Sequence, residues 1–139
     1  MAGVRRGARA VLKYFIALYI VAVIIQVFLA GEGIFGAEGS PTDDDQSTTL
    51  DPHRGLGWFL TMPIAFLLLI VALLAWLPNK RNRVLAIALP FILFVQLILG
   101  DAGRWGGAFH PLNAILILGI LGYLANQLWR RPAEPVAPV

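Results

Sequence analysis

The chain contains no cysteine, so neither a disulfide bond nor a thiolate metal site is available to it. Charged residues make up only 14% of its 139 residues, whereas hydrophobic residues make up 58% and the mean hydropathy is +0.75. Such a chain is too apolar for a soluble domain of this size. No charged residue lies in the middle of a long apolar stretch, which argues against a transporter with an ion or proton pathway.

Four apolar stretches are long enough, or nearly so, to cross the ~30 Å hydrocarbon layer as helices of ~20 residues. Because lipid offers no hydrogen bonds to the backbone, these stretches are expected to be helices and not open strands. The predicted fold is all-α, an integral membrane four-helix bundle that forms one domain over residues 1–131. The predicted segments are helices at 11–30, 56–77, 84–100 and 111–129, an outer loop at 37–52 and a disordered tail at 132–139.

Basic and acidic residues gather at opposite ends of these stretches. Nine of the eleven Lys and Arg residues lie at one end, and seven of the eight acidic residues lie at the other. The positive-inside rule then places both termini in the cytoplasm of a multi-pass cell-membrane protein. The pI near 9.8 reflects this topology, so the lipid bilayer is the expected partner and no nucleic acid is expected. The basic residues of the inner end are Arg5, Arg6, Arg9, Lys13, Lys80, Arg81, Arg83, Arg130 and Arg131.

One motif occurs twice, each time at the end of an apolar stretch. Residues 26–36 and 96–106 both begin with Gln, two apolar residues, Leu and a small residue, and both end with Gly, any residue, an aromatic residue and Gly. Each copy is followed by one of the chain's only two histidines, His53 and His110. The repeat predicts two pseudo-repeated helical hairpins, with polar groups at equivalent places and a site at one end of the bundle.

Both histidines are expected at the start of a helix that runs inward from the outer face. Asp51 followed by Pro52 is typical of an N-cap and a first helical position, and His53 comes next. Pro111 directly after His110 suggests a similar start for the fourth helix. The two imidazoles are therefore expected to converge near the outer leaflet.

Further polar residues are expected close to the two histidines. Gln26 and Gln96 lie ~20 Å from the inner ends of their helices at ~1.5 Å per residue, which is the outer half of the bilayer. Arg54 and Arg104 are the only basic residues expected on that side. One turn after the first histidine, Gly57 is expected to leave room beside the imidazole ring.

Two imidazoles on parallel helices can ligate one planar metal macrocycle from opposite faces, and histidine is a standard axial ligand of haem iron. Guanidinium groups suit the haem propionates because they pair bidentately with carboxylates. The second nitrogen of each imidazole needs an acceptor, such as a carboxylate or a backbone carbonyl. The predicted haem b site consists of the axial ligands His53 and His110 with Arg54, Arg104, Gln26 and Gln96.

The order of these residues resembles one four-helix half of haem A synthase, and also small four-helix membrane proteins of unknown function. The haem A synthase resemblance implies bundles whose histidine pairs bind haem, and half-length members that pair as oligomers. Three residues before the second-helix histidine, that family has a catalytic glutamate, whereas this chain has Leu50 and lacks the family's loop cysteines. Haem binding is therefore carried over, and catalysis is not. The residues that carry the resemblance are Gln26, Ala30-Gly31, His53-Arg54, Gln96, Leu99-Gly100 and His110, within residues 26–128.

Two other functions fit the same residues. The first is a non-catalytic structural or accessory membrane protein, in which the glutamines and glycines serve helix packing. The second is an outer-face zinc or copper site, in which the histidines are joined by Asp51, Asp101 or Glu32. A second copy of the chain and a membrane redox partner are compatible with the haem hypothesis. A cleaved secretory signal ending near residue 30 is disfavoured, because the apolar run is long and carries the repeated motif.

Overall fold

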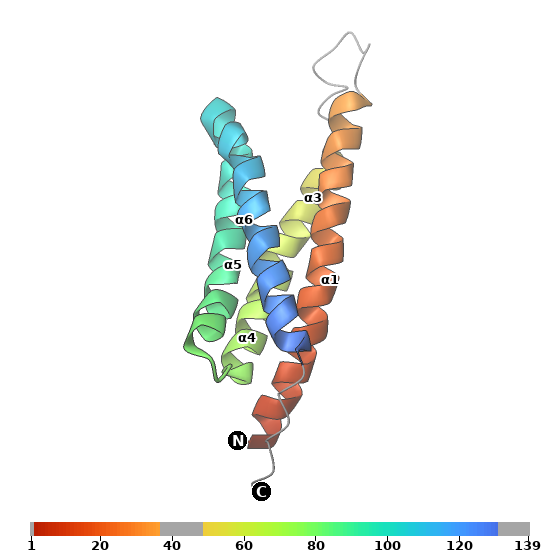
Figure 1. Ribbon diagram of the computed structural model, residues 1–139. Coiled ribbons are helices and arrows are strands. Elements are labelled where there is room, and N and C mark those ends of the chain that lie inside the picture. The colour runs from red at the N-terminus through yellow and green to blue at the C-terminus, as the bar shows by residue number, and fades with distance from the viewer. Residues whose placement is uncertain (1, 37–48, 131–139) are drawn as a thin grey trace, which may run out of the picture.

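A computed structural model describes residues 2–36 and 49–130 of the chain (Figure 1). Within these ranges the chain forms helices and no strand, as an all-α fold requires. The predicted outer loop lies mostly, and the predicted tail wholly, outside the described residues. The helices are α1 (Ala2–Phe35), α3 (Asp51–Phe59), the π-helical turn η1 (Leu60–Ile64), α4 (Ala65–Ala75), α5 (Lys80–Asp101) and α6 (Gly103–Trp129).

All four long helical segments, counting α3, η1 and α4 as one, are long and apolar enough to cross a membrane. In the most apolar 18 residues of each segment, only 22% to 39% of the residues are buried inside the protein. Large apolar side chains such as Phe28 (70% exposed) and Leu18 (69% exposed) face outward. Lipid tails are as apolar as these side chains, so the surface suits a bilayer and not water. The chain is therefore a multi-pass integral membrane protein.

The four segments pack in a ring in which α1 contacts α4, α4 contacts α5, α5 contacts α6, and α6 contacts α1. Figure 1 shows the start of α1, the end of α6 and the α4–α5 turn at one end, which we call the basic end. The α1–α3 pair and the α5–α6 pair diverge toward the other end, which carries Glu32, Asp51 and Asp101 and which we call the acidic end. The fully buried side chains that join the segments include Leu12, Ile16, Leu68, Leu89, Leu121 and Leu124.

The fourth segment begins earlier than the sequence predicted. α6 starts at Gly103, directly after α5, so His110 lies inside the helix and not at its start. The break between the two helices falls at Ala102, and the next residue, Gly103, has a φ of +65°, which is accessible to glycine. Pro111 does not end the helix, because neighbouring groups can replace the one backbone hydrogen bond that a proline removes from a membrane helix. The prediction of a helix start at Pro111 was therefore wrong.

The other helix starts also differ from the predicted ones. The N-cap of α3 is Leu50, which makes no side-chain cap bond, and Asp51 is the first helical residue. In that first turn its carboxylate still complements the helix dipole. α1 begins at Ala2, well before predicted residue 11, because a helix can continue into water with polar residues once it leaves the apolar layer.

A proline in the middle of the second segment is accommodated by the π-helical turn. Pro63 lies within η1 and cannot donate a backbone hydrogen bond, which loosens the ladder at this point. Two hydroxyls then bond nearby carbonyls: Tyr19 Oη donates to Leu60 O, and Thr61 Oγ1 donates to Gly57 O at 2.7 Å. The bond from α1 thus fixes the position of the segment that carries the first histidine.

Candidate functional site

α3 and α6 bring the two histidines of the chain together at the acidic end. The ring centroids of His53 and His110 are 6.1 Å apart, and the planes of the rings are inclined by 70°. Both side chains are half-buried. α3 belongs to one diverging helix pair and α6 to the other (Figure 1), so each pair contributes one of the two imidazoles.

Each imidazole is held by a backbone carbonyl of the helix beside it. His53 Nδ1 lies 3.0 Å from Gln26 O, and His110 Nδ1 lies 3.0 Å from Gln96 O. A carbonyl oxygen can only accept, so Nδ1 carries the hydrogen in both rings. In the neutral imidazole, Nε2 then keeps its lone pair, which is the arrangement that outer-shell carbonyls impose on metal-binding histidines.

The side chains of the two motif glutamines have different surroundings. Gln96 Oε1 accepts from Asn113 Nδ2 at 2.8 Å, and the same nitrogen donates to Ile92 O at 3.2 Å. Gln26 Oε1 is buried and has no hydrogen-bond partner among residues 2–36 and 49–130. A Cβ atom at Gly57 would lie 2.9 Å from Gln26 Nε2. The room predicted beside the imidazole is therefore filled by the glutamine amide, because α1 packs directly against α3.

The two arginines of the predicted site lie at its surface. Arg54 Nη1 is 3.9 Å from Asp51 Oδ1, and these side chains are 59% and 71% exposed. Such an exposed ion pair contributes little to stability. Arg104 is exposed on the second residue of α6. Both guanidinium groups thus remain accessible to an anionic group that approaches the acidic end.

A metal site with additional carboxylate ligands is not assembled by the described part of the chain. Residues 2–36 and 49–130 contain no group of three or more His, Cys, Asp or Glu side chains that could hold a metal ion. The zinc or copper alternative needs Asp51, Asp101 or Glu32 next to the histidines, and that third ligand is not in place.

Asn113 is the member of this cluster that the sequence analysis missed. It lies one turn after His110 in an apolar helix, and a polar residue inside a membrane helix is itself a signal of helix–helix bonding or function. Its amide ties α6 to two residues of α5 and so holds the hairpin that carries the second histidine.

Replacing Asn113 by alanine is expected to lower the free energy of unfolding by ~1–2 kcal/mol, because two interhelical hydrogen bonds are lost within the apolar layer. Asn126→Ala is the matched control on the same helix. Asn126 is exposed and its amide oxygen accepts from the exposed Arg130, so a change within about 0.5 kcal/mol is expected. Reversible unfolding in mixed micelles measures both values, and equal losses would contradict the role assigned to Asn113.

Comparisons with known proteins place the chain without giving it an activity. The profile of a family of unknown function, DUF6220, matches residues 26–103. That match begins at Gln26, includes His53 and Gln96, and ends before His110. No curated protein and no solved structure matches the chain, and none of these comparisons shows a haem A synthase relationship. More than half of the sequence lies within the match, and the chain therefore belongs to the DUF6220 family.

Proposed function

We propose that this membrane protein binds haem b, with His53 and His110 as the two axial ligands. The observation that carries the proposal is that both imidazole rings have the same tautomer and the same kind of hydrogen-bond partner. Each imidazole comes from a different helix pair, and each is fixed by a backbone carbonyl in the tautomer that leaves Nε2 free to ligate.

The separation of the rings fits one metal ion between them. Two metal–nitrogen bonds of ~2 Å, with roughly 1 Å from each nitrogen to its ring centre, place axial imidazole centroids ~6 Å apart. The centroids of His53 and His110 are 6.1 Å apart. An edge-to-face ring pair falls in a similar range of ~4.5–7 Å, so the shared tautomer is what favours a metal over simple packing.

The two hairpins make the same contact, which supports the proposal that they are pseudo-repeats. In the first hairpin His53 bonds the carbonyl of Gln26, and in the second His110 bonds the carbonyl of Gln96. The hairpins differ in one contact. In the second hairpin an asparagine, Asn113, donates a hydrogen bond to the side chain of Gln96. A duplicated hairpin would supply one axial ligand from each copy.

The other site residues would support the haem without taking part in a reaction. The glutamine carbonyls orient the imidazoles and raise their basicity. Arg54 and Arg104 are exposed at the same end and suit the propionates. A haem iron with two imidazole ligands exchanges single electrons, so we propose electron transfer, with haem handling or sensing as alternatives. No residue is assigned a catalytic role, since Leu50 stands where haem A synthase has its catalytic glutamate.

Titration of the detergent-purified, haem-free protein with ferric haem tests this proposal. Saturation at one haem per chain, with the absorption of a six-coordinate low-spin haem, is expected. Zinc and copper ions are titrated in parallel as probes. Tight binding of either ion without a low-spin haem spectrum would contradict the proposal in favour of a simple metal site. No binding of haem or of either ion would leave a structural or accessory role.

We also propose that both termini lie in the cytoplasm and that the haem site lies near the outer face of a cell membrane. Among the described residues, the basic side chains lie at the basic end except Arg54 and Arg104, which supports this orientation. Single cysteines can report it, because the chain has none of its own. Gly3 and Gly107 lie at opposite ends and have open space where a Cβ would be added.

On intact cells, a membrane-impermeant maleimide is expected to label Gly107→Cys and to leave Gly3→Cys unlabelled until the membrane is permeabilised. The two variants serve as controls for each other. The opposite labelling pattern would reverse the orientation and place the histidines near the cytoplasmic face.

A further inference from the structure

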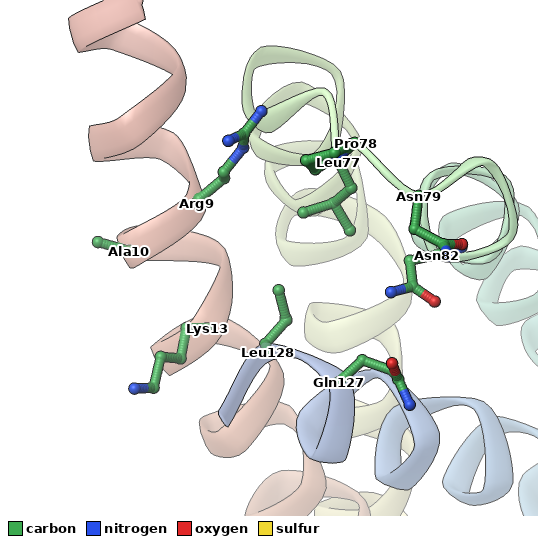
Figure 2. A pocket seen from close by; sticks show the side chains of 9 residues that line it. All are labelled: Arg9, Ala10, Lys13, Leu77, Pro78, Asn79, Asn82, Gln127 and Leu128. Atoms are coloured by element: carbon green, nitrogen blue, oxygen red, sulfur yellow. The ribbon is translucent and has the colours of Figure 1, made fainter. Parts of the chain in front are cut away.

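A pocket of about 460 Å³ lies at the basic end, far from the histidines, between α1, the α4–α5 turn, the start of α5 and the end of α6. Figure 2 shows Arg9 and Lys13 on α1, with Asn82 and Gln127 on the facing helices. Leu77, Pro78 and Leu128 give the pocket an apolar wall. Its size is within the ~300–1,000 Å³ typical of small-molecule sites.

The two cations of the pocket are held in place by neutral groups. Arg9 donates from Nε to Ala75 O at 3.0 Å and from Nη2 to Trp76 O at 3.2 Å, the carbonyls at the end of α4. The Lys13 ammonium lies 3.7 Å from the centre of the Trp129 ring. Neither contact neutralises the positive charge, so both cations remain available to an anion.

The basic end also lacks compensating negative charge in the part of the chain that the structure describes. Every acidic side chain in residues 2–36 and 49–130 lies at the acidic end, on the opposite side of the apolar layer. The N-cap of α5, Asn79, and one residue of its first turn, Asn82, line the pocket, and a helix N-terminus carries a partial positive charge. The pocket therefore favours a ligand with a negative charge.

The side chain of Asn82 lines the pocket and offers it a hydrogen-bond donor. Asn82 Oδ1 is buried and has no partner among the described residues, whereas the Asn82 backbone N–H donates to Asn79 Oδ1 at 3.1 Å. The amide nitrogen of Asn82 points toward the other lining side chains in Figure 2 and can donate to an anion in the pocket.

We propose that this pocket binds the headgroup of an anionic phospholipid, such as phosphatidylglycerol, from the leaflet at the basic end. The phosphate lies near Arg9 and Lys13, the Asn82 amide nitrogen donates to the headgroup, and Leu77 and Leu128 contact the start of the acyl chains. Pockets rich in basic residues between membrane helices are a known way to hold anionic headgroups. The proposal is independent of haem binding, because the two sites lie at opposite ends of the bundle.

Native mass spectrometry of the full chain, released from micelles with added lipid, tests the proposal. Phosphatidylglycerol is compared with phosphatidylcholine, which has the same phosphate but no net charge, and with inorganic phosphate. The variants are Lys13→Gln, which removes a pocket charge, and Asn82→Asp, which adds a negative charge at nearly constant shape. Arg6→Gln is the matched control, since Arg6 is an exposed cation on α1 that does not line the pocket.

One phosphatidylglycerol is expected to bind each wild-type chain in preference to phosphatidylcholine. Lys13→Gln and Asn82→Asp are each expected to weaken that binding about fivefold or more, while Arg6→Gln changes it less than twofold. Equal losses in all three variants would show general attraction to the surface and overturn the proposal. Equal binding of the two lipids would also overturn it, and displacement of the lipid by inorganic phosphate would assign the pocket to a soluble anion. Unfolding in micelles checks that both pocket variants are folded.

Discussion

His53→Ala and His110→Ala are each expected to abolish the low-spin haem spectrum and to weaken haem binding by more than ~100-fold. Removing a hydrogen-bond partner of a metal ligand typically costs ~10–100-fold, and under the proposed haem binding these substitutions remove a ligand itself. Both variants should behave alike, because the two imidazoles have the same hydrogen-bonding state and lie 6.1 Å apart. Absorption spectra and haem titrations of the purified variants measure the effect.

Added imidazole separates loss of a ligand from loss of the fold. Each alanine substitution leaves a space of the size of the missing ring, so free imidazole is expected to restore the low-spin spectrum. Gly107→Ala, one turn before His110 on α6, is the control and should keep the wild-type spectrum, since nothing lies within 4 Å of the added Cβ. A single variant that retains the full low-spin spectrum without imidazole would rule out axial ligation by that histidine.

Gly106→Ala is expected to lower the free energy of unfolding by ~1–3 kcal/mol, the usual cost of forcing one methyl group into a packed interior. Gly106 is buried where α6 passes the end of α5. A Cβ there would meet the Cβ of Ala102 and would lie 2.6 Å from the backbone oxygen of Leu99. Because a backbone atom cannot turn aside as a side chain can, the α5–α6 hairpin must open at the end that carries the second histidine.

The neighbouring glycine provides the matched comparison. Gly107→Ala adds the same methyl group to the same helix in open space, and it is expected to stabilise the protein by up to ~1 kcal/mol through lower backbone entropy in the unfolded chain. Reversible unfolding in mixed micelles measures both variants. Similar changes in the two would contradict the close packing of α5 against α6 at Gly106.

The number and type of the helices follow from the sequence because lipid imposes a length and a secondary structure on apolar segments. Their ends do not follow in the same way. A helix can continue past the apolar layer, as α1 does back to Ala2. The start of α6 depends on one residue with φ of +65°, Gly103, and not on Pro111, the strongest signal in that region.

For the site, the sequence pattern predicts which residues are involved, whereas helix packing determines which contacts they make. The repeated glutamine motif and the two histidines indicated which helices carry polar groups at the acidic end. That the histidines bond main-chain carbonyls, and that the Gln26 amide fills the space at Gly57, depend on how each helix is rotated against its neighbour. The contact of Asn113 with Gln96 depends on the same rotation. Hydrophobic periodicity is weak in a helix that is apolar all round, so the sequence leaves that rotation open.

The reduced-minus-oxidised absorption spectrum of the wild-type protein, purified from membranes of cells supplied with haem, tests the central claim most directly. Bis-histidine haem between α3 and α6 predicts the sharp α and β bands of a low-spin b-type haem at close to one equivalent per chain. A colourless protein that stays colourless after haem is added back would contradict haem binding and leave the paired histidines as a packing contact.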